Sequence, residues 1–291
     1  MKLIDFSTHR RVTVTMFVVA AAIFGDARAV RFRPLSSLER FTALQSGEVD
    51  LLSRTTTWTM SRDTALGASF VGVIYYDGQA MMVRKALGVT SALELSNVSV
   101  CTAAGTTSEL NIADYFRLHN IPYELVTYQK DDEGIEAYDS KRCDVYTTDA
   151  SGLAANRQKL TDPNEHVILP EIISKEPLGP LVRQGDDEWF DIARWVLNAF
   201  IIAEELGVTQ ANVDSMKSTK NPAIRRLVGV EGSFGEVIGL NKEWACNVIR
   251  SVGNYGEIFD RNVGPDTPRG ISRGLNALWS DGGILFAPPI R

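Results

Sequence analysis

Strand-like and helix-like segments alternate along the chain from residue 30 onwards, and this alternation limits the fold more than any other feature. Such alternation is typical of α/β proteins, in which helices cover the faces of a sheet. The sequence therefore predicts an α/β architecture. The predicted strands are residues 30–33, 49–53, 70–76, 79–84, 98–101, 123–127, 143–146, 166–169 and 181–183. The predicted helices are residues 36–45, 91–95, 106–118, 132–140, 149–159 and 187–206, followed by a mostly helical remainder.

Signals at the helix ends support these predictions. Ser36 with Glu39, and Thr106 with Glu109, have the spacing of a capping box, in which side chain and backbone satisfy each other's hydrogen bonds. Residues 187–206 repeat apolar side chains at helical spacing, and Gly207 follows as a stop signal. This last segment is the clearest helix in the chain.

Size and charge set the class of protein. At 291 residues the chain is long enough for two lobes, or for one large domain with an inserted one. Its net charge of -6 argues against nucleic acid or an anionic membrane as a general partner, because both prefer basic surfaces. The three histidines share no ligand spacing with the cysteines, so we predict no metal site.

The chain has three cysteines, too few for a disulfide framework. Cys101 and Cys143 each lie in or beside a predicted strand, so one bridge between neighbouring strands is an option in an oxidising compartment. Three buried free thiols, with Cys246 as the third, are the alternative. The sequence alone does not choose between them.

Residues 55–62 carry several hydroxyls and one guanidinium directly after a predicted strand. Thr55 and Thr57 offer hydroxyl and backbone donors, and Arg62 offers planar donors with a permanent charge, which together suit a carboxylate. The alternative for Arg62 is a solvated arginine in the first turn of a helix. The crowding of threonines favours the binding interpretation.

A second polar turn begins at Thr106 and Thr107, and an isolated acid, Asp149, precedes another predicted helix. The threonines are expected to cap a helix, and the positive end of that helix favours an anion as well. Asp149 is either an N-cap or the acceptor of a ligand ammonium group. Together with Arg62, these residues form the pattern of an amino-acid clamp.

The sequence contains none of several common catalytic motifs. The chain has no G-x-S-x-G elbow, no P-loop, no H-E-x-x-H sequence and no dinucleotide fingerprint. We therefore predict no catalytic residue, no cofactor and no enzymatic activity.

Four runs resemble the general L-amino-acid-binding proteins, a group of type II periplasmic substrate-binding proteins of ABC importers (the polar amino-acid family, family 3). They are residues 39–50, 147–153, 169–180 and 252–259, within a resemblance that extends roughly over residues 19–291. The resemblance implies mixed sheets flanked by helices in two lobes that are joined by two hinge strands. We place the first lobe at 1–86 and 180–291 and the inserted lobe at 87–179.

The resemblance also implies a function and a site. A periplasmic, monomeric receptor would bind L-amino acids of several kinds between its lobes and deliver them to an inner-membrane ABC permease. By position, Arg62 would hold the α-carboxylate, helped by Thr55, Thr57 and the helix start at Thr106 and Thr107. Asp149 would accept the α-ammonium group.

The start of the chain departs from this family. Residues 9–29 imitate a secretory signal with an A-x-A cleavage site, yet residues 20–27 resemble the end of a helix inside the mature fold. Residues 1–18 do not resemble what precedes that helix in the family. A shortened or altered reading frame is the expected explanation.

Two other functions are compatible with the same fold. A cyclohexadienyl or arogenate dehydratase would need a general acid or base, for which Asp149 is the one candidate. A truncated homologue would bind no ligand.

Overall fold

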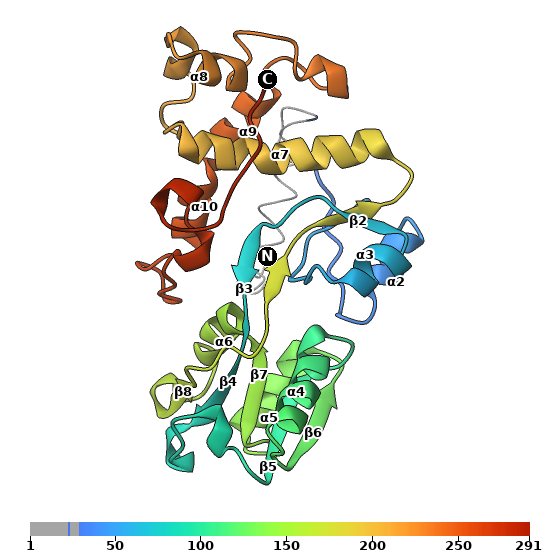
Figure 1. Ribbon diagram of the computed structural model, residues 1–291, viewed down its shortest axis with the longest axis vertical. Coiled ribbons are helices and arrows are strands. Elements are labelled where there is room, and N and C mark those ends of the chain that lie inside the picture. The colour runs from blue at the N-terminus through green and yellow to red at the C-terminus, as the bar shows by residue number, and fades with distance from the viewer. Residues whose placement is uncertain (1–22, 24–28) are drawn as a thin grey trace, which may run out of the picture. The chain divides into compact units, whose positions relative to one another are not determined.

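The computed structural model describes Ile23 and residues 29–291 (Figure 1). Contacts divide the chain into two compact units. Unit 2 contains Pro34–Ala43 and Tyr75–Leu178, and unit 1 contains Leu44–Ile74, Gly179–Arg291 and the described residues before Pro34. The lobe boundaries that the sequence predicts, at 86/87 and 179/180, stay predictions. The signal-like run and the helix end at 20–27 lie outside the described residues, apart from Ile23 and residue 29.

Unit 2 is an α/β unit with two sheets. Its strands are β3 (Tyr75–Asp77), β4 (Gln79–Arg84), β5 (Val98–Ala103), β6 (Tyr123–Tyr128), β7 (Val145–Asp149), β8 (His166–Ile168) and β9 (Glu176–Leu178). Its helices are α4 (Thr107–Leu118), α5 (Asp131–Asp139) and α6 (Ala150–Arg157), with 3-10 turns at Lys85–Leu87, Ala92–Glu94 and Pro163–Glu165. The order β6-β5-β7-β4-β8 forms the larger sheet, which is mixed, because β5 pairs in parallel with β6 and β7 while β4 pairs antiparallel with β7 and β8.

Helices cover both faces of this sheet (Figure 1). In β4, Ala80 and Met82 pack with the α5 residue Tyr138, whereas Met81 and Val83 belong to the core on the opposite face. That opposite core includes Ile112 and Phe116 of α4. Successive side chains of a strand point to opposite faces, so a strand buried on both sides reads as a continuous apolar run.

Strands β3 and β9, which begin and end the longer segment of unit 2, form a separate antiparallel pair. Tyr75 faces Leu178 and Asp77 faces Glu176 in the register of this pair. We call the pair the crossover ribbon. The hinge strands that the resemblance implies stay a prediction.

Unit 1 combines a small antiparallel sheet with most of the helices. Its strands, in the order β1-β10-β2, are β1 (Leu51–Leu52), β10 (Leu181–Arg183) and β2 (Ala68–Phe70). Its helices are α3 (Met60–Ala65), α7 (Asp187–Glu205), α8 (Pro222–Leu227), α9 (Trp244–Val252) and α10 (Tyr255–Val263), with 3-10 turns at Ser215–Ser218, Glu236–Ile238, Gly274–Asn276 and Trp279–Asp281. Helix α2 (Arg40–Gln45) spans the division between the units. The long helix α7 matches the clearest sequence prediction, with Asp186 as its N-cap and Gly207 at φ 66° after it.

Three predicted elements differ most from the structure, and in addition the helix predicted at 91–95 is only a 3-10 turn at Ala92–Glu94 and the strand predicted at 143–146 is β7 at Val145–Asp149. The predicted strand at 30–33 is wrong, because these residues have no strand pairing and Pro34, which follows, lacks a backbone donor. The predicted strand at 70–76 is split into β2 and β3, which pair with different partners. The helix predicted at 36–45 begins only at Arg40, although Ser36 and Glu39 make the expected capping-box hydrogen bonds.

Among the described residues, no helix has the length and apolar character needed to cross a membrane.

Candidate functional site

The sequence-predicted residues of unit 1 lie between β1 and the first turn of α3. Thr59 is the N-cap of α3, and its hydroxyl accepts a hydrogen bond from the backbone N–H of Arg62 at 3.3 Å. The Nη1 atom of Arg62 donates to the carbonyl oxygen of Thr57 at 3.1 Å. This carbonyl therefore fixes one edge of a guanidinium that has five N–H donors in all.

Arg62 is in the first helical turn, as the alternative interpretation had it, but it is not a solvated arginine. Its exposed fraction is 9%. A guanidinium offers planar, permanently charged donors, which are suited to an anion such as a carboxylate. Of the two predicted threonines, Thr57 is buried and Thr55 is exposed. The neighbouring Trp58 stacks on Phe70 with ring centroids 5.1 Å apart.

In unit 2, Thr106 caps α4 as predicted. Its hydroxyl accepts from the N–H of Glu109 at 3.3 Å and donates to the carbonyl of Ala103 at 2.6 Å. The Glu109 carboxylate bonds to the N–H of Gly105 and not to that of Thr106, so the predicted capping box is displaced by one residue. Because capping uses the Thr106 hydroxyl in both directions, contact between this turn and an anion would be made mainly by backbone N–H groups.

Asp149 ends β7 and occupies the N-cap position of α6, but its side chain makes no capping hydrogen bond. Asp149 is therefore the N-cap residue by position, as one alternative expected, but without a side-chain cap hydrogen bond. Asp149 lies at the carboxyl end of a strand that is parallel to β5, and β5 leads into the helix that begins at Thr107. The carboxyl ends of neighbouring parallel strands are where ligands bind in open α/β sheets.

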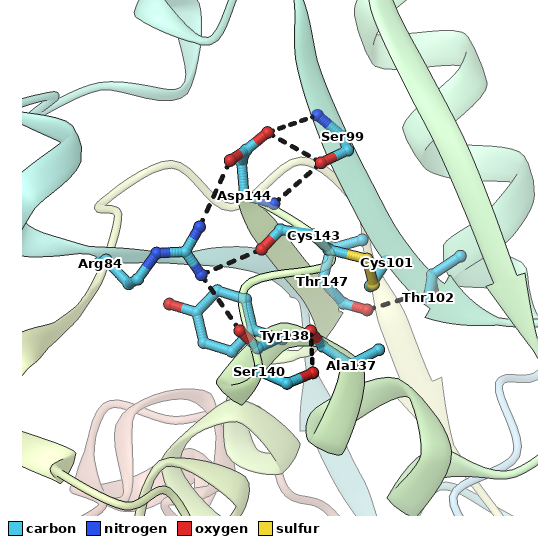
Figure 2. The surroundings of a disulfide bond; sticks show 10 residues. All are labelled: Arg84, Ser99, Cys101, Thr102, Ala137, Tyr138, Ser140, Cys143, Asp144 and Thr147. Atoms are coloured by element: carbon cyan, nitrogen blue, oxygen red, sulfur yellow. Dashed lines mark hydrogen bonds and ion pairs between the residues drawn. A yellow bond between two sulfur atoms is a disulfide. The ribbon is translucent and has the colours of Figure 1, made fainter.

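A disulfide joins Cys101 of β5 to Cys143, just before β7, with the Cα atoms 5.8 Å apart (Figure 2). Cys246 is the buried free cysteine. Arg84 of β4 adds to this link, since its Nη1 donates to the carbonyl of Cys143 at 3.0 Å and its Nη2 pairs with Asp144 at 3.3 Å. The bridge thus joins the two strands that lead to the predicted ligand residues of unit 2.

Burial sets the protonation of the aromatic groups behind this sheet. Burial raises the pKa of Tyr146, which lies three residues before Asp149, so this phenol stays protonated in the folded protein. Burial also raises the pKa of Tyr138 and lowers that of His166, and the Tyr138 hydroxyl is 2.7 Å from Nδ1 of His166. All three groups are therefore neutral at pH 7.

Sequence reasoning missed two buried or part-buried carboxylates beside these residues. Glu176 accepts a hydrogen bond from the hydroxyl of Thr107 at 3.0 Å, and Asp77 accepts one from the hydroxyl of Ser151, the second residue of α6. Glu176 lies in the run 169–180, which contains Pro170, Pro177 and Pro180. A lone acid next to Pro177 carries little local signal, because two of its partners, Thr107 and Asn111, are 69 and 65 positions away.

The structure therefore groups Thr55, Thr57 and Arg62 within unit 1, and Thr106, Thr107 and Asp149 within unit 2. No group of three or more histidine, cysteine, aspartate or glutamate side chains suited to a metal ion occurs in the part of the chain described.

Comparison with known proteins identifies the family. The general L-amino acid-binding periplasmic protein AapJ of Rhizobium johnstonii is 60% identical over 94% of this chain and 81% of its own length. The chain belongs to the family of periplasmic amino-acid-binding proteins of ABC transporters. The glutamate/glutamine/aspartate/asparagine-binding protein BztA of Rhodobacter capsulatus is 53% identical over the same 94% of the chain and 81% of itself.

A solved structure agrees with this family. A periplasmic binding protein of an ABC transporter from Brucella ovis, with glutathione bound, has a TM-score of 0.94 and 54% identity, covering 96% of this chain and 88% of that one. No family model matched the chain. The predicted family, the type II periplasmic-binding-protein fold and the role of solute-binding receptor are confirmed. The relatives named are binding proteins of transporters and not enzymes, which favours the receptor over the dehydratase alternative.

Proposed function

We propose that this receptor works in the periplasm as a monomer without enzymatic activity, binds L-amino acids through their α-carboxylate and α-ammonium groups, and delivers them to the permease of an ABC importer. Two observations support the proposal: Arg62 is buried beside Thr57 in one unit, and Asp149 lies at the carboxyl end of β7 in the other. The names of the relatives support amino acids as the ligand class.

In this proposal each unit supplies half of the site. Arg62, Thr55 and Thr57 contact the α-carboxylate with help from the helix start at Thr106 and Thr107, and Asp149 accepts from the α-ammonium group. Each charge-assisted hydrogen bond contributes about 1.5–3 kcal/mol, so a few of them supply the ~8 kcal/mol of micromolar binding. A ligand that contacts both units stabilises their closed arrangement through its differential contacts.

The groups of the ligand that the site contacts determine how specific the receptor is. Contacts to the two backbone ions are common to all amino acids, so they leave the side chain loosely specified. This supports a receptor of broad specificity.

Glutathione is a second candidate ligand, because the Brucella ovis relative holds it. Its γ-glutamyl group carries a free α-carboxylate and α-ammonium group, the same pair of ions as a free amino acid. The clamp proposed here would hold that end of the tripeptide, and the rest would need room beyond the clamp.

Isothermal titration with the common L-amino acids and with glutathione tests the proposal. We expect saturable heat with several amino acids, and no heat with any of them from a folded sample would contradict it. A ligand must raise the melting temperature of a binder, so an unchanged melt with an amino-acid mixture would instead support the truncated, non-binding alternative.

Two substitutions test the site itself. Arg62→Ala should weaken binding by about 100-fold or more, since a desolvated charge pair loses one partner. Asp149→Asn should weaken binding similarly, because it removes the negative charge that faces the α-ammonium group in this proposal. Arg226→Ala is the control for loss of a part-buried arginine elsewhere in unit 1, and its affinity should stay unchanged. Unchanged affinity in Arg62→Ala would remove that residue from the site.

A further inference from the structure

Two carboxylates stand directly opposite each other in the crossover ribbon. Asp77 ends β3 and Glu176 begins β9, and the two are Cα partners in the antiparallel pair. Directly opposite residues share one face of such a pair, where like charges destabilise it. The exposed fraction of Glu176 is only 1%. Two acids that face each other across a strand pair must be stabilised by hydrogen bonds from other groups. Such locally unfavourable pairs often occur at functional sites.

Three side-chain donors stabilise the buried carboxylate of Glu176. Its Oε2 atom accepts from the hydroxyl of Thr107 at 3.0 Å, and its Oε1 atom accepts from Nδ2 of Asn111 at 2.7 Å and from the hydroxyl of Ser174 at 2.6 Å. Thr107 and Asn111 are one helical turn apart at the start of α4. The carboxylate thus forms hydrogen bonds with the first turn of this helix, where the helix dipole favours a negative charge.

Asp77 forms similar hydrogen bonds with the start of α6. Its Oδ2 atom accepts from the hydroxyl of Ser151, and its Oδ1 atom from the backbone N–H groups of Ser151 at 3.4 Å and Gly78 at 3.0 Å. The N–H of Ala150, the first residue of α6, donates to the carbonyl of Gly78 at 2.8 Å. Each acid of the ribbon therefore binds one of the two helices that begin at the predicted ligand residues.

We propose that Asp77 and Glu176 are positioning residues for ligand binding, which hold the starts of α6 and α4 at fixed places on the crossover ribbon. The inference rests on the proposed function, which gives Thr107 and Asp149 contacts with the ligand. Through these two carboxylates, the amino-acid half-site of unit 2 and the ribbon form one rigid piece.

Glu176 also sets the polarity of the Thr107 hydroxyl. A hydroxyl has one proton, and that of Thr107 is donated to the carboxylate. Towards a ligand the hydroxyl oxygen is then an acceptor, which suits an N–H donor and not a carboxylate. A ligand carboxylate would meet only the backbone N–H at this position.

The variants Glu176→Gln and Asp77→Asn test the proposal. Each keeps the size of the side chain but turns one acceptor oxygen into a donor that faces existing donors. We expect about tenfold weaker amino-acid binding or more in each variant, as for loss of hydrogen bonds to a charged group.

Asp144→Asn is the matched control. Asp144 accepts from the N–H of Ser99 at 3.0 Å and from its hydroxyl at 2.8 Å, and it pairs with Arg84 (Figure 2). It precedes β7, whereas Asp149 ends that strand. The control should lower the melting temperature while its affinity changes by less than about twofold. If Asp144→Asn weakens binding as much as Glu176→Gln does, Glu176 is merely structural and the proposal is overturned.

A double-mutant cycle separates action through Thr107 from a general effect. Once Thr107→Val has removed the hydroxyl, adding Glu176→Gln should weaken binding by much less than it does in the unmodified protein. Fully additive losses would overturn the claim that Glu176 sets the polarity of Thr107.

Amide hydrogen exchange without ligand makes the test independent of the proposed function. Glu176→Gln should speed exchange at the first turn of α4, and Asp77→Asn at the first turn of α6, whereas Asp144→Asn should do neither. Unchanged exchange at both helix starts would overturn the proposal even if the protein binds amino acids. Absence of ligand binding in the unmodified protein, with the exchange pattern as expected, would remove the proposed function and the ligand role but keep the two tethers.

Discussion

Replacing both Cys101 and Cys143 by alanine should cost the protein about 4 kcal/mol through loss of the crosslink alone. The two residues are separated by 42 positions. Closing a loop of this length removes about 13 cal/mol/K of entropy from the unfolded chain, which is about 4 kcal/mol at 25 °C. That is a large share of the ~5–15 kcal/mol by which a native protein is stable. Both cysteines are fully buried, so loss of packing adds to this cost.

Urea unfolding followed by circular dichroism measures the effect. Cys246→Ala is the control, because it removes a buried sulfur atom that takes part in no crosslink. The double variant should lose about 4 kcal/mol more than twice the loss in Cys246→Ala. Mass spectrometry of the unreduced wild-type protein verifies the bridge beforehand. A loss in the double variant no larger than twice that of the control would refute the reasoning that the closed loop stabilises unit 2.

Two further predictions concern packing and pH. Gly179→Ala should destabilise the protein by about 1–3 kcal/mol, because its Cβ would lie 2.2 Å from the carbonyl oxygen of Gly72. Gly152→Ala should cost little, because its nearest contact would be the methyl group of the Thr148 side chain at 3.2 Å. Equal thermal melts of the two variants would contradict this. Burial lowers the pKa of His166, so the unfolded chain binds a proton below pH ~6.5 that the folded chain does not, and stability should fall as pH drops through this value. Urea unfolding at pH 7.5 and pH 5 should show a smaller loss in His166→Asn than in the wild type, and parallel losses would exclude His166 as the cause.

Much of the fold could be predicted because its signals are local. The hydroxyl of Thr106 and the N–H of Glu109 are three residues apart, and the predicted cap is observed. Strand β4 was predicted with its observed bounds, since an apolar run of this length suits a strand buried on both faces. The strand predicted at 30–33 failed because apolar and charged residues alternate there without a partner strand, and alternation alone does not supply hydrogen bonds.

The candidate site was predictable in part for the same reason. Arg62 and Thr57 are five positions apart, so the local pattern contained their contact. Glu176 and Thr107 are 69 positions apart, and only the folded chain brings them together. The disulfide was an open choice in the sequence, because spacing does not show whether two strands are neighbours. The structure supplies the missing fact, which is that β5 and β7 pair directly.

The central claim is that Arg62 and Asp149 recognise the two ions that every α-amino acid carries. Isothermal titration with L-glutamate, with glutarate and with γ-aminobutyrate tests it most directly. Glutarate lacks the α-ammonium group and γ-aminobutyrate lacks the α-carboxylate, while the rest of the chain is shared. The account predicts saturable binding of L-glutamate and at least ~100-fold weaker binding of both analogues, since each analogue lacks the ion that one of these two charged side chains recognises. Binding of either analogue as tightly as L-glutamate would contradict it.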